Sequence, residues 1–244
     1  MELTAVHSSR LHAAMQQPGQ ATVGIVLAGG NSTRLASVAA TGGGKALLTF
    51  QGKTFLENVV TVVAAEVGPT IVVAAAGQRL PALDGVRIVH DLTPGAGPLA
   101  GIRDGLRAVL AVDDAGQAGH AGHAAAQPLR LAFVASCDVP LLRREVVRLL
   151  TALAAESDAL WTVPVVHGHR QVLVSVMRVE LLAQIEAWLS SGRRDLRGLF
   201  KEMAQTDPQS VGEVTEEACK AVDPTLESFV DIDTPDDLER LQSR

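Results

Sequence analysis

The stretch Gly24–Leu35 reads GIVLAGGNSTRL, an apolar run that ends on two glycines, small polar residues and an arginine. A short apolar run bounded in this way is typical of a buried strand followed by a turn. Gly29 and Gly30 let the backbone turn sharply and bring its N–H groups close to an anion, and Arg34 adds a fixed positive charge. The stretch is therefore interpreted as a phosphate cradle, with an ordinary glycine-rich turn as the alternative.

Two better-known phosphate-binding motifs are excluded. The dinucleotide fingerprint G-x-G-x-x-G does not follow this strand. The segment GGGKA at residues 42–46 fails as a P-loop, because Ala39 stands where that motif needs its first glycine and Ala46 where it needs Ser or Thr.

Outward from this stretch, short apolar runs alternate with longer segments whose apolar residues recur at helical spacing. This alternation predicts an α/β protein whose mostly parallel sheet carries helices on both faces. Residues 1–22 have no sustained period and are expected to be a flexible extension, and residues 23–244 to form one domain. The expected strands are 22–28, 70–76, 86–90, 129–136, 159–166 and 171–177, and the expected helices are 54–67, 97–111, 143–156 and 178–190.

One low-complexity insert, residues 112–128, separates a helix from a strand and is predicted to be a mobile loop. His120 and His123 lie within it. Because the insert is rich in Gly and Ala and its histidines lack a cysteine or acidic partner, solvated histidines are favoured over metal ligands.

Composition limits the class of partner. The chain has 244 residues, 47% of them hydrophobic, and a net charge of -6, which disfavours nucleic acid or an anionic membrane as a partner recruited by bulk charge. With no Tyr, five Phe and two Trp, it offers little for stacking bases. Two cysteines make no disulfide framework, and the sequence shows no signal peptide or membrane span, so we expect a cytoplasmic protein.

Two further strand ends carry carboxylates. Asp138 follows the run that ends at Ser136, where a carboxylate suits a hard divalent cation bridging phosphates; a helix cap is the alternative. The neighbouring Cys137 is interpreted as a small buried residue rather than a nucleophile. Near the other end of the chain, Asp231 and Asp233 alternate with apolar residues, which predicts one face of a strand. Thr234 and Pro235 then predict the start of a last helix. Asp233 is open between a metal ligand and a structural role.

In this order, the motifs LAGGNSTRL followed by Lys45, GPLAGI at residues 97–102, CDVP at 137–140 and FVDIDTPDDL at 229–238 resemble the MobA family, the molybdenum cofactor guanylyltransferases. The resemblance covers residues 23–241. It implies a Rossmann-like three-layer α/β/α nucleotidyltransferase fold. It also implies transfer of GMP from GTP to the terminal phosphate of Mo-molybdopterin, with release of pyrophosphate and dependence on Mg²⁺.

Carried over by position, the resemblance implies a nucleotide-binding loop and a small set of charged catalytic residues. Asp138 matches the magnesium ligand, which Asp233 is expected to join, and Lys45 matches the phosphate-binding lysine that acts with Arg34. The residues expected to bind the nucleotide are Leu27, Ala28, Gly29, Gly30, Lys45, Asp91 and Asp138.

The acceptor is expected to bind later segments, through Arg170, Gln171 and Arg194, whose alternative is a solvated surface. GTP and Mo-molybdopterin are the implied substrates, and molybdoenzymes or cofactor-insertion proteins the implied transient partners. Ala74 stands where the family uses an asparagine, and ten residues separate Arg34 from Lys45, so the choice between GTP and CTP stays open.

Three other classes remain alternatives. The first is a nucleotidyltransferase of the same fold that uses CTP or another phosphorylated acceptor. The second is a non-catalytic nucleotide-binding module, against which the presence of both Lys45 and Asp138 counts. The third is a nicotinamide-dependent oxidoreductase, which the missing fingerprint disfavours.

Overall fold

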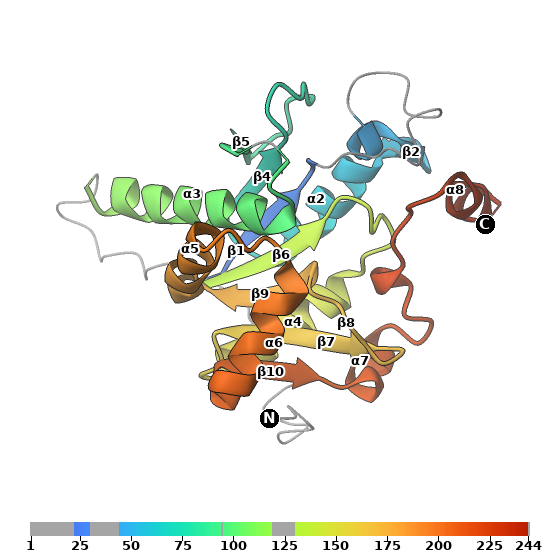
Figure 1. Ribbon diagram of the computed structural model, residues 1–244. Helices are drawn as coiled ribbons and strands as arrows, with labels where there is room; N and C mark the ends of the chain where they lie inside the picture. The colour runs from blue at the N-terminus through green and yellow to red at the C-terminus, as the bar shows by residue number, and fades with distance from the viewer. Residues whose placement is uncertain (1–21, 30–43, 94, 119–129, 244) are drawn as a thin grey trace.

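The computed structural model describes residues 22–29, 44–93, 95–118 and 130–243. One main sheet runs through the molecule in the order β10-β7-β9-β6-β1-β4-β5, with β8 paired to β7 (Figure 1). The main strands are β1 (Thr22–Leu27), β4 (Thr70–Ala74), β5 (Val86–His90), β6 (Leu131–Ser136), β7 (Trp161–Val166), β8 (His169–Arg170), β9 (Val174–Arg178) and β10 (Val211–Val214).

Helices cover both faces of this sheet and make it the middle of three layers, as the alternation of strands and helices predicts. Alternate residues of each strand point to opposite faces, so β1 sends Val26 into one core and Ile25 into the other. One face packs against α2 (Phe55–Glu66), α4 (Arg144–Ala155) and α7 (Glu216–Val222), and the other against α3 (Pro98–Ala118), α5 (Leu182–Ser190) and α6 (Leu196–Thr206).

Two glycines let the helices approach β1 closely. A Cβ on Gly24 would lie 2.5 Å from Val63 Cγ1 of α2, and a Cβ on Gly105 of α3 would lie 2.7 Å from Ile25 Cγ2. Both helices therefore lie close against the central strand, which keeps the strand end after Leu27 in a fixed place.

The sheet is parallel except at β8 and β9. β6 pairs with β1 in parallel, whereas β9 runs antiparallel to both β6 and β7. Only seven residues separate Val166 from Val174, and a parallel crossover needs a dozen or more. The chain instead turns at His167 and Gly168, both with positive φ, and returns antiparallel.

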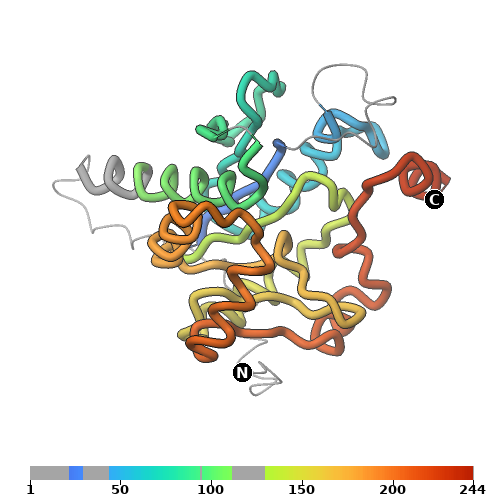
Figure 2. Tube along the Cα trace, viewed as in Figure 1, coloured from blue at the N-terminus to red at the C-terminus, as the bar shows by residue number. Residues whose placement is uncertain are grey.

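A small third core joins the C-terminal segment to the region after Lys45. Helix α8 (Pro235–Gln242) begins at Thr234, which forms a capping box with Asp237, as the sequence predicts. It packs beside the hairpin of β2 (Thr49–Phe50) and β3 (Lys53–Thr54), and Figure 2 shows the red C-terminal segment on the same side of the molecule as the light-blue segment that carries this hairpin. The buried residues of this core are Leu48, Phe55, Ile232, Leu238 and Leu241.

Two expectations from the sequence are wrong. Helix α3 continues to Ala118, seven residues into the insert expected to be a loop; the rest of that insert, with His120 and His123, lies outside the described residues. Asp231 and Asp233 lie in an extended segment rather than in a strand. A single backbone bond, from Ile232 N to Asp138 O at 2.9 Å, links this segment to the turn after β6, so no ladder forms.

Candidate active site

Lys45, Asp138 and Asp233 meet at one point although they come from three separate parts of the chain. Lys45 lies in the short 3-10 helix η1 (Gly44–Leu47), Asp138 in the turn after β6, and Asp233 just before α8. Lys45 Nζ donates a hydrogen bond to Asp233 Oδ1 and lies 3.6 Å from Asp138 Oδ2. The structure therefore brings together the lysine and the two carboxylates that the sequence analysis selected separately.

The electrostatics of this cluster keep Lys45 charged. Burial lowers the pKa of Lys45, but the hydrogen bond to Asp233 and the charge of Asp138 outweigh it and hold this pKa above its ordinary value. Burial and the charge of Asp233 raise the pKa of Asp231 nearby. The Lys45 and Asp138 side chains are 16% and 21% exposed, so the cluster remains open to a ligand from solvent.

Leu27 is the last residue of β1, and together with Ala28 and Gly29, which follow it, it bonds to both neighbouring strand ends. Cys137 N donates to Leu27 O at 2.9 Å, and the amides of Ala28 and Gly29 both donate to Val73 O, at 2.9 and 3.2 Å. The Gly29 amide is therefore already bonded to the neighbouring strand end. The rest of the predicted phosphate cradle, with Gly30 and Arg34, lies outside the described residues.

Gly29 has a different reason to be glycine. A Cβ at this position would lie 2.8 Å from the backbone nitrogen of Ala75, which follows β4. The close approach of two strand ends, rather than the approach of a ligand, excludes a larger residue here.

Gln78 also joins the ends of β1 and β4, and the sequence analysis missed it. Its Oε1 accepts a hydrogen bond from Ala75 N at 2.8 Å, and its Nε2 donates to Ala28 O at 3.1 Å. The sequence signal is that a polar residue directly follows a glycine just beyond a buried strand. Gly77 does turn the chain with a positive φ, which leaves Gln78 well placed to bond to the strand ends.

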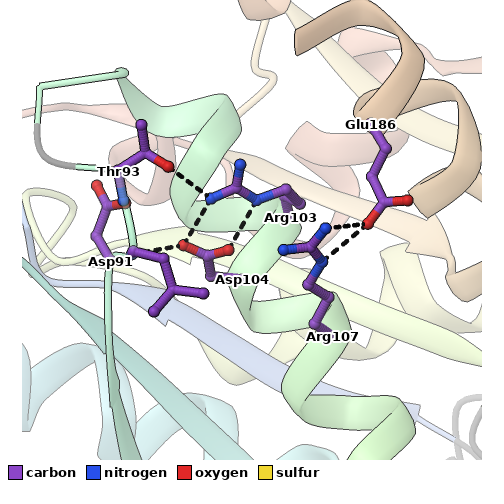
Figure 3. A network of polar contacts seen from close by, with 7 residues as sticks. Asp91, Thr93, Arg103, Asp104, Arg107 and Glu186 are labelled. Atoms are coloured by element: carbon purple, nitrogen blue, oxygen red, sulfur yellow. Dashed lines mark hydrogen bonds and ion pairs between the residues drawn. The ribbon is translucent and has the colours of Figure 1, made fainter. Parts of the chain in front are cut away.

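Asp91 follows β5, two strands away from β1 in the sheet order. Its backbone N–H donates to Ala74 O at 2.8 Å, and its Oδ1 accepts from Thr93 N at 2.7 Å. Figure 3 shows the polar network around it, which also includes Arg103 and Asp104 of α3. Asp91 thus lies at the same edge of the sheet as β1 but is not part of the Lys45 cluster.

The residues expected to bind the acceptor each have other neighbours in the structure. Arg170 pairs with Glu213, Nε to Oε1 2.6 Å, and its guanidinium carbon lies 5.1 Å from the centre of the Phe200 ring. Gln171 Nε2 donates to His169 O at 3.4 Å. Arg194 is exposed, and its carbonyl oxygen lies 3.9 Å from where a Cβ of Gly97 would stand, so it lies beside the GPLAGI segment.

Two carboxylates around one ammonium fit a magnesium ion that takes its other ligands from water and phosphate oxygens. Within the described residues, no group of three or more His, Cys, Asp or Glu side chains could hold a metal by itself.

The structure also answers two questions about the turn after β6. Asp138 is not the N-cap of the next helix, because α4 begins after Arg143, whose side chain makes no capping bond. Cys137 is buried, and burial raises the pKa of its thiol, which confirms that it is a small buried residue.

The fold and the site together define an α/β protein with its ligand site at the carboxyl ends of parallel strands. Residues 24–207 match the family described as the MobA-like NTP transferase domain. The chain belongs to this family of nucleotidyltransferases.

Within the described residues, no helix combines the length and apolar character needed to cross a membrane.

Relatives support this assignment. A protein named probable molybdenum cofactor guanylyltransferase from Mycobacterium avium is 37% identical over 181 residues, which span 72% of this chain and 79% of the relative. A protein with the same name from Mycobacterium tuberculosis is 34% identical over 178 residues, which span 72% of this chain and 77% of that relative.

Solved structures share the fold at lower identity. Molybdopterin-guanine dinucleotide biosynthesis protein A from Archaeoglobus fulgidus has a TM-score of 0.67 at 22% identity and covers 91% of this chain and 97% of its own. A manganese complex of Rv0371C from Mycobacterium tuberculosis has a TM-score of 0.57 at 18% identity, covering 91% and 98%. The 2-C-methyl-D-erythritol 4-phosphate cytidylyltransferase from Thermus thermophilus has a TM-score of 0.59 at 17% identity, covering 90% and 96%.

Proposed function

We propose that the protein is a molybdenum cofactor guanylyltransferase, which transfers GMP from GTP to the terminal phosphate of Mo-molybdopterin and releases pyrophosphate. The names of the curated relatives support the reaction. The observation that carries the proposal is the meeting of Lys45 with Asp138 and Asp233 at the carboxyl edge of the sheet. We further propose that the chain from β1 onward acts as one domain, in the cytoplasm, and that the residues before Thr22, the first residue of β1, are an extension.

The reaction needs charge neutralisation more than a protein nucleophile. An oxygen of the acceptor phosphate attacks the α-phosphorus of GTP, a new P–O bond forms, and the bond to the β-phosphate breaks. The attacking oxygen is already deprotonated, so the protein need not supply a general base. Lys45 can stabilise the triphosphate once its ammonium turns from Asp233 to a phosphate oxygen, and Arg34 is proposed to add a second positive charge.

Asp138 and Asp233 would hold the magnesium ion. When bound, Mg²⁺ neutralises the phosphate oxygens and orients the leaving pyrophosphate. The manganese complex of a protein of this fold is consistent with a divalent cation. The two carboxylates carry two negative charges, and the single ammonium of Lys45 balances only one of them. The remaining negative charge attracts a cation.

The nucleotide is proposed to lie over the ends of β1, β4 and β5, in contact with Leu27, Ala28, Gly29, Gly30 and Asp91. For the acceptor, Arg194 has the better support, because it is exposed beside Gly97. Arg170 already pairs with Glu213 and must leave that carboxylate to bind a phosphate. Gln171 is the next residue after Arg170 and directly follows β8.

A cytidylyltransferase is the second candidate, and Ala74 favours keeping it. The Ala74 side chain is fully buried, and its methyl group offers no hydrogen bond to a base. A solved cytidylyltransferase also shares the fold. The selection between guanine and cytosine would then depend on other residues of the same edge.

Calorimetric titration with GTP, CTP and ATP, each with Mg²⁺, tests the proposal. Binding of GTP in preference to CTP and ATP supports it and justifies an assay with Mo-molybdopterin. Preference for CTP would retain the mechanism and change the product. No binding of any of the three would overturn the nucleotidyltransferase assignment and favour a non-catalytic module.

A further inference from the structure

Helix α3 carries a buried carboxylate that the proposed reaction does not use. The Asp104 side chain is 4% exposed, and both of its oxygens are bonded. Oδ2 accepts from Leu92 N at 2.9 Å, and Arg103 donates to Oδ1 from Nε at 2.7 Å and to Oδ2 from Nη2 at 3.0 Å. A charge buried in this way needs such partners to be tolerated.

Arg103 extends the contact to the next residue of the same loop. Its Nη2 also donates to Thr93 Oγ1 at 3.1 Å. Hydrogen bonding to Asp104 raises the pKa of Arg103, which keeps the guanidinium group charged. Figure 3 shows the two side chains converging on the loop that follows β5, although adjacent residues of a helix do not ordinarily face one another.

This network ends at the nucleotide edge of the sheet. Thr93, held by Arg103 through its hydroxyl group, donates its N–H to Asp91 Oδ1 at 2.7 Å. The loop then leads to Gly97 and the start of α3. The interior of α3 is thus linked through Thr93 to the side chain of Asp91.

We propose that Arg103 and Asp104 are positioning residues, which hold Leu92 and Thr93 after β5 and so orient Asp91 toward the nucleotide. A buried ion pair is weak evidence that the pair stabilises the fold, because well-packed apolar residues in the same place often stabilise a protein as much. What this pair supplies is a defined place for Leu92 N and the Thr93 hydroxyl. The inference rests on the proposed function, since it assigns Asp91 to nucleotide binding.

Asp104→Asn and Thr93→Ala test the proposal, with Glu186→Gln as the matched control. Asp104→Asn removes the charge that orients Arg103, and Thr93→Ala removes one exposed hydroxyl group without disturbing the interior of the helix. Glu186 of α5 pairs with Arg107, which lies in α3 like Arg103 and Asp104, at 2.6 Å. Both of these side chains are exposed, and neither bonds to Leu92 or Thr93. Backbone hydrogen exchange, the affinity for GTP and the melting temperature are measured for each variant.

We expect Asp104→Asn to speed amide exchange at residues 92–93 and to weaken GTP binding about tenfold, a change equivalent to one lost contact. Thr93→Ala should weaken GTP binding about threefold at an unchanged melting temperature. Glu186→Gln should match the wild type in all measurements. If both Asp104→Asn and Thr93→Ala leave the GTP affinity unchanged, this inference is overturned while the proposed function stands. A wild-type protein that binds no nucleotide overturns the proposed function, and the assigned role of this pair with it.

Discussion

Lys45 illustrates what can be predicted for a single residue. Resemblance selected Lys45 and Asp138 separately, and Asp233 stayed open between a metal and a structural role. Asp233 lies 188 positions from Lys45, and no local pattern reports a contact over that separation. For Gly29, the turn predicted after the strand lies outside the described residues, and the close contact with Ala75 is a tertiary feature that no local pattern reports.

Asp138→Asn should abolish turnover while the protein stays folded. The amide keeps the size of the side chain but removes one of the two charges that would hold the metal, so we expect kcat to fall by about 10³-fold or more. Asp236→Asn, an exposed change in the first turn of α8, is the control. Circular dichroism checks the fold and a pyrophosphate-release assay the rate; near-normal turnover of Asp138→Asn would contradict its role as a metal ligand.

Lys45→Met should have opposite effects on two ligands. The ammonium of Lys45 competes with a cation for Asp138 and Asp233, so its removal should strengthen binding of Mn²⁺ alone. The same change removes a positive charge from the triphosphate and should weaken GTP binding. Electron paramagnetic resonance of free Mn²⁺ and calorimetry with GTP measure the two effects. If Lys45→Met weakens both, the lysine does not compete with the metal.

At the scale of elements, periodicity predicts the regular pieces and misses the irregular ones. The six strands and four helices expected around the main sheet are present, because each combines a clear period with enough length, and so is the last helix; the strand expected at Asp231 and Asp233 is not. Helix α6 was missed, although Leu196, Leu199, Phe200 and Met203 follow an N-cap at Asp195 with helical spacing. Strand β10 has only four residues, too few for a reliable pattern.

Gly105→Ala and Gly101→Ala, both in α3, should change stability in opposite directions. Alanine stabilises a helix interior by about 1 kcal/mol relative to glycine. At Gly105 the new Cβ would lie 2.7 Å from Ile25 Cγ2 of the central strand, an overlap that costs about 1–3 kcal/mol. At Gly101 the nearest atom is Leu27 Cδ2 at 3.3 Å, the movable end of a side chain.

Urea unfolding of the two variants gives the comparison. We expect the free energy of unfolding to fall for Gly105→Ala and to stay level or rise for Gly101→Ala. Equal changes at the two positions would show that the helix is free to shift away from β1.

At the scale of the whole molecule, the sequence predicts the three layers, which the structure confirms, and the edge of the sheet that we propose binds the ligand. Both follow from chirality and burial, which hold for any chain with this alternation. The selection of the base does not follow, because it depends on which side chains converge beyond the strand ends. The reversal of β9 could be predicted only from the short connection after β7.

Both cysteines should be unreactive in the folded protein. Cys137 and Cys219 are buried free thiols, and burial raises the pKa of Cys219 to about 12. Because the thiolate is the reacting form, DTNB should label neither thiol of the native protein quickly and both after unfolding in guanidinium chloride. Fast labelling of one thiol would reveal local opening around it, and Cys→Ser variants would identify which.

The order of synthesis gives the contact between Lys45 and Asp233 a consequence in time. A ribosome that adds about 5–20 residues per second needs roughly 10–40 s to cover the 188 positions between them. By the end of that interval every described strand of the main sheet has been synthesised, while Lys45 still lacks one of its carboxylates. The emerging chain therefore cannot assemble the complete charged cluster until Asp233 has followed the whole sheet.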